Sequence, residues 1–131
     1  MPQKSVSEDT DIRANLEPVS VSVIKKRRDF LALRDARRAN SASFLMVARK
    51  NPENGDAARV GFTVTKKMGG AVVRNRMRRR LRAAATEVFP QYAAPGCDYV
   101  LIARRAAESR NFAILLDDMK RALLSLRRNP K

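Results

Sequence analysis

The spacing of apolar residues along the chain predicts three amphipathic helices, over about residues 26–38, 72–89 and 111–127. The apolar residues that set this spacing are Phe30, Leu33 and Ala36 in the first helix, Val73, Met77, Leu81, Ala84 and Val88 in the second, and Leu115, Met119, Ala122, Leu123 and Leu126 in the third. At 100° per residue, those of the second helix fall within roughly 80° of arc. The second helix therefore presents one apolar face to a core and an arginine-rich face on its opposite side.

Three shorter stretches read as strands, over residues 43–49, 59–65 and 99–103. In the second stretch Val60, Phe62 and Val64 alternate with smaller or polar residues, which indicates a strand with one buried face. The third stretch, Tyr-Val-Leu-Ile-Ala, is apolar enough to be buried on both faces. The link over residues 51–56, Asn-Pro-Glu-Asn-Gly-Asp, is rich in turn formers, so it predicts an antiparallel hairpin between the first two strands.

The resulting order α-β-β-α-β-α predicts an α/β sandwich of the α+β type, in which helices pack on a small central sheet. A chain of 131 residues is long enough for a single core, and we assign residues 21–128 to one domain. Residues 1–20 are polar, contain four of the thirteen acidic residues, and include Pro2 and Pro18. This composition predicts a disordered acidic arm.

The charge of the chain is strongly one-sided, with a formal net charge of +15. Residues 59–86 hold nine basic residues and no acidic one, and most of the nine lie on the second predicted helix. Cations near a helix N-terminus are unfavourable by roughly 0.3–1 kcal/mol each and the arginines repel one another, so local stability does not explain them. Solvated charged faces usually mix signs, whereas no acid lies between Asp56 and Glu87. A polyanion is therefore the expected partner, with RNA or DNA favoured and an anionic membrane surface as the rival.

Several classes of chemistry are excluded by residue type. With Cys97 as the sole cysteine and no histidine, the chain cannot form an internal disulfide, a zinc site of the usual ligands or an imidazole-based triad. The Lys66-Lys67 pair before Gly69-Gly70 lacks the P-loop spacing, so nucleotide hydrolysis is not expected. Asp117 and Asp118, adjacent on a helix, read as a cap and a solvent residue. We expect no catalytic residue, no metal ligand and no small-molecule substrate.

Nothing in the chain predicts a membrane protein. No stretch of about 18 apolar residues is present, and the N-terminal residues lack the charged start and apolar stretch of a secretory signal. We therefore expect a cytoplasmic protein without a membrane partner.

The run Arg59-Val-Gly-Phe-Thr-Val-Thr-Lys-Lys-Met-Gly-Gly-Ala-Val-Val-Arg-Asn-Arg-Met-Arg-Arg-Arg-Leu-Arg82 resembles the signature of the protein subunit of bacterial ribonuclease P. The resemblance extends from about residue 24 to the last predicted helix. It implies a ribonucleoprotein endonuclease in which the RNA subunit carries out Mg²⁺-dependent removal of the 5′ leader from precursor tRNA. It also implies a ribosomal protein S5 domain 2-like fold with a left-handed βαβ crossover, although about 98% of such connections are right-handed.

The resemblance assigns two groups of binding residues. Those implied to bind the catalytic RNA are Lys66, Lys67, Arg74, Asn75, Arg76, Arg78, Arg79 and Arg82. Those implied to line a cleft for the leader of precursor tRNA are Phe30, Arg34, Phe44 and Met46. Arg34 stands where the family commonly has a second aromatic residue, which suggests a phosphate contact there. Mg²⁺ is expected to be bound mainly by the RNA subunit and the substrate.

Two other functions remain open from the sequence. A noncatalytic RNA-binding protein, such as a ribosomal protein or an RNA chaperone, would also present a basic helix on a small α/β sandwich. A DNA-binding protein ranks third, because no part of the chain reads as a helix-turn-helix.

Overall fold

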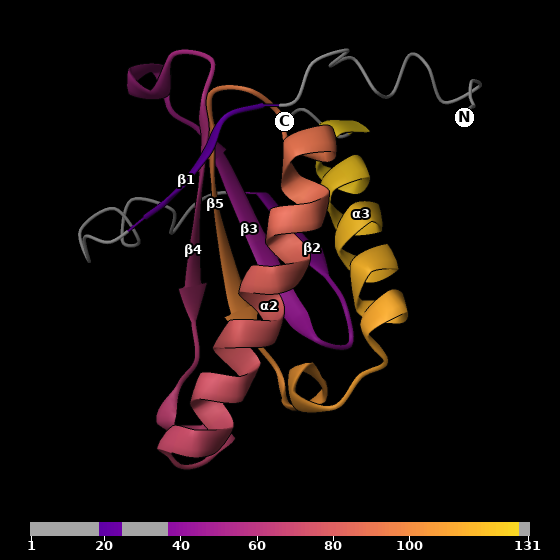
Figure 1. The fold of residues 1–131 in the computed structure, drawn as a ribbon. Helices are drawn as coiled ribbons and strands as arrows, with labels where there is room; N and C mark the ends of the chain where they lie inside the picture. The colour runs from indigo at the N-terminus through magenta and orange to yellow at the C-terminus, as the bar shows by residue number, and fades with distance from the viewer. Residues whose placement is uncertain (1–18, 25–36, 129–131) are drawn as a thin grey trace.

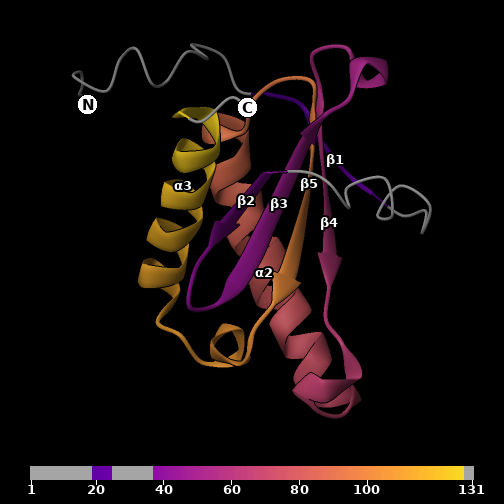
Figure 2. The same cartoon turned by 180° about the vertical axis from the view of Figure 1, so that it is seen from behind.

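The structure, a computed structural model, describes residues 19–24 and 37–128. A five-stranded mixed sheet runs through it in the order β1-β4-β5-β3-β2. The strands are β1 (Val21–Val23), β2 (Arg37–Asn40), β3 (Phe44–Lys50), β4 (Ala58–Thr63) and β5 (Cys97–Ala103). Two long helices, α2 (Ala71–Tyr92) and α3 (Phe112–Arg128), lie side by side on one face of this sheet (Figure 1; from behind in Figure 2). The α+β architecture predicted from the sequence is confirmed.

The apolar faces predicted for the two long helices are also confirmed. All five core residues predicted in α3 are buried, as are Met77, Leu81, Ala84 and Val88 of α2, while Val73 packs against the core from a half-buried position. These side chains meet the helix-facing residues of the sheet in one main cluster. The core thus fixes the rotation of α2 about its own axis, which decides where its arginines point.

The predicted hairpin between residues 43–49 and 59–65 is wrong, because β5 lies between β3 and β4. β5 pairs with β3 antiparallel and with β4 parallel, and takes the centre of the sheet, as expected for a strand buried on both faces. The turn-rich link instead passes the start of β5. The Asn51 N–H donates to the Gly96 carbonyl at 2.7 Å, and the Gly96 N–H donates to the Ala57 carbonyl at 2.9 Å.

Gly96 makes this crossing possible. Its φ of 76° lies in the left-handed region, and a Cβ at this position would approach the Gly55 carbonyl oxygen to 3.1 Å. A larger residue would therefore be strained in its backbone and would crowd the link.

The connection from β4 through α2 to β5 is a crossover between parallel neighbours. In Figure 1 both strands run down the page, α2 returns in front of the sheet, and β5 lies to the right of β4, which makes the crossover left-handed. The closer likeness to the ribosomal protein S5 domain stays a prediction.

Two short strands, β1 and β2, were not predicted from the sequence. β1 pairs parallel with β4, and β2 pairs antiparallel with β3. The predicted helix over residues 26–38 lies mostly outside the described residues, but its last two residues, Arg37 and Arg38, belong to β2, so its predicted end is wrong. Each of these edge strands has only three or four residues, too few for a periodic signal.

The end of α2 also differs from the prediction, because the helix continues through Pro90 to Tyr92. Pro90 has no N–H to donate to the carbonyl four residues earlier, so α2 lacks that one hydrogen bond and still continues for two more residues. The Pro90 carbonyl accepts a hydrogen bond from the Val19 N–H at 2.8 Å, and Val19 is only 8% exposed. The packed part of the chain therefore begins no later than Val19, and residues 1–18, which include most of the predicted acidic arm, lie outside the described residues.

A buried carboxylate organises the end of the sheet where the β3–β4 link crosses β5. Asp98, whose side chain is 7% exposed, accepts two hydrogen bonds from Arg59, at 2.8 and 2.7 Å, and one each from Asn51 and Asn54. Burial alone would raise the pKa of Asp98, but the hydrogen bonds from Arg59, Asn54 and Asn51 outweigh it and hold this pKa below its ordinary value. Asp98 thus joins β4, β5 and the link.

Candidate nucleic-acid interface

The candidate interface begins at the turn that leads from β4 into α2. A short 3₁₀ helix, η3 (Lys66–Met68), places both lysines just before the helix, and both are exposed. Gly69 follows with a φ of 138°, a conformation that L side chains rarely adopt, and a Cβ there would lie 3.2 Å from the Val73 Cβ. The Arg74 Nε donates back to the Gly69 carbonyl at 3.1 Å. This hydrogen bond holds the Arg74 side chain against the turn that carries the two lysines.

The solvent side of α2 carries the remaining predicted residues. Asn75, Arg76, Arg79 and Arg82 are exposed, whereas Arg74 and Arg78 are half-buried. Arg78 donates to the Asn75 side chain at 3.4 Å. Arg79 and the two lysines form no hydrogen bond or ion pair through their side chains with any described residue. The structure thus brings all eight predicted RNA-binding residues onto one helix and the turn before it.

One predicted residue of this surface has an acidic partner. Arg76 forms an ion pair with Glu108 at 3.2 Å, and the two side chains are 50% and 34% exposed. An exposed pair of this kind stabilises a protein by no more than about 1 kcal/mol, so a phosphate can compete for the guanidinium. The sequence did not predict this partner. Glu108 lies in a separate 3₁₀ helix, η4 (Arg105–Glu108), and nothing in the sequence pattern indicates that this segment lies near α2.

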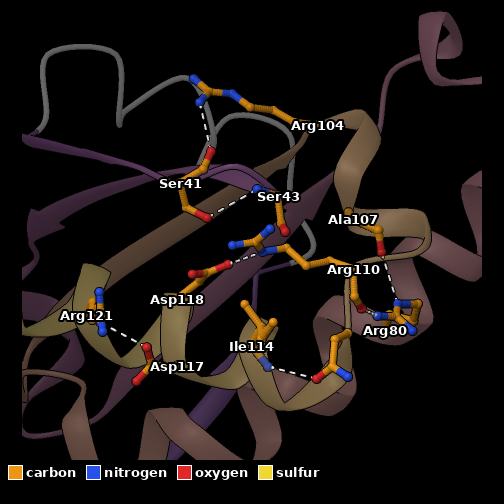
Figure 3. A network of polar contacts seen from close by, with 11 residues as sticks. Ser41, Ser43, Arg80, Arg104, Ala107, Arg110, Ile114, Asp117, Asp118 and Arg121 are labelled. Atoms are coloured by element: carbon orange, nitrogen blue, oxygen red, sulfur yellow. Dashed lines mark hydrogen bonds and ion pairs between the residues drawn. The ribbon is translucent and has the colours of Figure 1, made fainter.

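Arg80 lies in the same arginine run but has a structural role. Its guanidinium donates to the Ala107 carbonyl at 3.0 Å and to the Arg110 carbonyl (Figure 3). It also lies 5.9 Å from the centre of the Phe112 ring. These contacts hold the connection between β5 and α3 against α2.

Arg82 also contacts an aromatic ring. Its guanidinium carbon lies 5.7 Å from the centre of the Phe62 ring on β4. Phe62 is half-buried and packs against the edge of the main core, so the prediction that it is a core residue holds only in part.

The predicted leader cleft is corrected at two of its four positions. Phe44 and Met46 are completely buried in the main core beneath the helices, so they cannot contact an RNA strand. Strand alternation explains the error, because their neighbours on β3 point to the opposite face of the sheet. On that face a second apolar cluster contains Ile24, Leu45, Val47, Val100 and Ile102. Phe30 and Arg34 lie outside the described residues.

The carboxylates of the described residues do not meet the needs of a metal site. Within residues 19–24 and 37–128, no three His, Cys, Asp or Glu side chains lie close enough to hold a metal ion together. Asp117 and Asp118 each pair with an arginine instead, Arg121 at 2.9 Å and Arg110 at 2.6 Å (Figure 3). The described residues therefore do not fit a protein-held magnesium site.

Cys97 is 2% exposed at the start of β5, and burial raises the pKa of its thiol.

Of the helices that the structure describes, none has both the length and the apolar character to cross a bilayer.

Comparison with known proteins shows what the chain is similar to. A family model described as Ribonuclease P matches residues 20–127. The ribonuclease P protein component of Ruegeria pomeroyi is 50% identical over 108 residues, which cover 81% of this chain and 86% of the relative. That of Caulobacter vibrioides is 48% identical over 103 residues, covering 79% and 69%.

Solved structures give the same picture at lower identity. The ribonuclease P protein of Staphylococcus aureus has a TM-score of 0.65 and 27% identity, covering 77% of this chain and 91% of that one. The ribonuclease P protein of Thermotoga maritima has a TM-score of 0.64 and 27% identity, covering 75% and 94%.

Proposed function

The chain belongs to the ribonuclease P protein family, and from this membership we propose that it binds the catalytic RNA of a bacterial-type ribonuclease P and the 5′ leader of precursor tRNA. In this role it is an RNA-binding subunit of a tRNA-processing ribonucleoprotein. It assists endonucleolytic removal of the leader in the cytoplasm, and the RNA subunit performs the hydrolysis.

The surface of α2 is the observation that carries the proposal. Its arginines are held at fixed positions because the opposite side of the helix is locked into the core. Arg79, with Lys66 and Lys67, has no partner among the described residues, so its charge is available to phosphates. Guanidinium groups bind phosphates bidentately, and each phosphate neutralised releases counterions. The repulsion within this array is relieved when an RNA strand lies along it.

Catalysis belongs to the RNA in this proposal. Mg²⁺ would activate water and stabilise the leaving oxygen at the scissile phosphate, held by the RNA subunit and the substrate. The described residues of the protein do not form a magnesium site, and its contribution is to bind and align the two RNAs.

Leader binding is assigned to the sheet face opposite the helices. Leu45 and Ile102 are half-buried there beside the buried Val47 and Val100. Bases of a single strand stack on aromatic and apolar side chains, which this face and Phe30 would supply. Phe44 and Met46 play no part in it.

Cleavage assays test the proposal. Labelled precursor tRNA is incubated with a cognate ribonuclease P RNA at low Mg²⁺, with and without the protein. We expect release of the leader only in the combined reaction. Failure to stimulate cleavage over a range of Mg²⁺ concentrations would favour a noncatalytic RNA-binding protein instead.

A matched pair of variants locates the binding surface. Arg79→Ala should weaken binding to the catalytic RNA by about tenfold and reduce the slope of log K against log salt by about 0.7–0.9. Arg121→Ala removes another exposed helical arginine, from α3, one that is paired with Asp117, and should leave both quantities unchanged. Phe30→Ala should weaken binding mainly of precursors with long leaders. Equal effects of the two arginine variants would remove the assignment to α2.

A further inference from the structure

A small apolar pocket opens at the edge of the sheet, between β1 and the C-terminal half of α2. Its volume is about 140 Å³, and it is lined by Val21, Val23, Val60, Phe62, Arg82, Ala85, Thr86 and Pro90. β1 is the outer strand on this side of the described sheet (Figure 1). Val23 is 40% exposed, whereas Val60 on the neighbouring strand is 3% exposed. The pocket thus leaves apolar surface open to solvent.

The polar groups of the pocket suit a flat, electron-rich ligand. The guanidinium carbon of Arg82, the one charged residue of the lining, lies 5.7 Å from the centre of the Phe62 ring, so the wall combines a planar cation with an aromatic ring. The Thr86 hydroxyl donates to the Arg82 carbonyl at 2.9 Å, which leaves its oxygen as an acceptor for an N–H group. The lining contains no acidic residue to repel a phosphate.

The position of the pocket on α2 connects it to the basic surface. Arg78 and Arg79 lie one turn before Arg82, and Arg79 is exposed without a described partner. A strand whose phosphates contact these arginines would bring its bases to the mouth of the pocket. The volume is well below the roughly 300 Å³ at which small-molecule sites usually begin, so it suits a single ring system.

We propose that this pocket holds one unpaired nucleobase of the RNA bound along α2, stacked against Phe62 and the Arg82 guanidinium. The inference rests on the proposed function, because it assumes that RNA lies on α2. Its new element is a base-binding site on the helix side of the sheet, separate from the face assigned to the leader. Stacking on an aromatic side chain tolerates any base, and the Thr86 oxygen would favour one that presents an amino or imino group.

Two matched substitutions test the pocket through equilibrium binding to the cognate catalytic RNA. Val23→Glu places a carboxylate at the pocket, whereas Ile114→Glu changes an apolar residue of similar exposure on α3, 46% against 40%. Both add one negative charge, so we expect Val23→Glu to weaken binding at least tenfold more. Phe62→Leu keeps an apolar side chain but removes the ring, and should weaken binding by about five- to a hundredfold. Thermal unfolding of each variant establishes that it is folded.

A cross-link on the unaltered protein avoids any dependence on folding of the variants. RNA containing 4-thiouridine or 6-thioguanosine is irradiated in the complex, and adducts are located by mass spectrometry. We expect an adduct within residues 59–64 or 82–90. Adducts confined to other peptides, together with equal effects of Val23→Glu and Ile114→Glu, would overturn the pocket. If the parent protein and both variants still stimulate cleavage of precursor tRNA in that case, the proposed function stands and only the base-binding pocket is lost. If the parent protein does not stimulate cleavage, the proposed function itself is contradicted.

Discussion

Arg59 and Arg79 belong to the same basic stretch of sequence but lie in opposite electrostatic environments. Arg59 donates two hydrogen bonds to the buried carboxylate of Asp98, and its side chain is 26% exposed. Arg79 is exposed on α2 and pairs with no described residue. The first arginine is part of the folded framework, and the second is available to a ligand. The number of basic residues in a sequence therefore overestimates the number available to bind RNA, because some of them form ion pairs or hydrogen bonds within the fold.

The same distinction divides α2 itself. Arg80 donates to two backbone carbonyls and lies against Phe112, whereas its neighbour Arg79 projects to solvent. A rotation of 100° per residue separates the two directions. If the distinction is correct, substitutions of framework arginines and their partners should change stability, and substitutions of exposed arginines should change RNA affinity.

The largest expected effect is on the framework side, at Asp98. Asp98→Ala leaves Arg59, Asn51 and Asn54 without their shared acceptor. Because Arg59 can partly rehydrate, we expect a loss of about 2–3 kcal/mol in the free energy of unfolding, less than for a fully buried pair. Urea unfolding of Asp98→Ala and of Asp117→Ala measures it. Asp117 is 50% exposed in its ion pair, so its substitution should cost less than about 1 kcal/mol. Similar losses for the two variants would contradict a special role of Asp98.

The next largest effect should separate the two neighbouring arginines of α2. Arg80→Ala removes the donor to the Ala107 and Arg110 carbonyls, and we expect a loss of about 1–2 kcal/mol in unfolding free energy. Arg79→Ala should change the unfolding free energy by less than about 0.5 kcal/mol, while weakening RNA binding as described above. Urea unfolding and RNA titration of both variants give the comparison. The distinction fails if Arg79→Ala destabilises the fold as much as Arg80→Ala does.

A smaller effect is expected when Asp98 is protonated and not removed. Its folded-state pKa is lowered, so the stability it contributes is complete above its unfolded-state pKa, near 3.9, and is lost as pH falls through the folded-state pKa. The protonated group can still accept some of its hydrogen bonds, so acid should destabilise the protein less at this site than Asp98→Ala does. Unfolding free energies measured from pH 6 down to pH 3 should fall less steeply for Asp98→Asn than for the parent. Parallel curves would exclude Asp98 as a source of the acid sensitivity.

The helices that carry the framework were largely predictable from the sequence. Met77, Leu81 and Leu115 repeat at helical spacing and are buried as predicted, because an amphipathic helix is encoded locally. The sheet order was not predictable in this way, since a turn-rich link is compatible with a hairpin and also with a passage around the end of a third strand. Asp98 and Arg59, which are 39 positions apart, give no sign in the sequence that they meet.

In the candidate site, too, residues on one continuous segment were predictable, and features that depend on contacts between distant segments were not. Lys66, Arg76 and Arg79 could be placed on one surface because they lie on one continuous turn and helix, whose rotation the apolar residues determine. Phe44 was misplaced because a short apolar strand does not reveal which of its faces meets the helices. The pocket beside Phe62 could not be foreseen, since it forms between β1 and α2, segments that the sequence does not connect.

The smallest expected effect on unfolding free energy is at Ser43. This buried polar residue lies near arginines but is not expected to stabilise the fold through its hydroxyl. Its side chain is completely buried beside the network around Arg104 and Arg110 (Figure 3), yet its Oγ has no hydrogen-bond partner among the described residues. Burying a hydroxyl costs free energy of desolvation, and without a hydrogen-bond partner nothing compensates for that cost. Ser43→Ala should therefore leave the unfolding free energy unchanged or raise it by up to about 1 kcal/mol. Ser41→Ala is the control, because the Ser41 hydroxyl accepts the Ser43 N–H at 3.2 Å and its removal should be slightly destabilising. A loss of stability in Ser43→Ala larger than that in Ser41→Ala would mean that the Ser43 hydroxyl has a partner after all, and that this end of the sheet belongs with Asp98 to the framework.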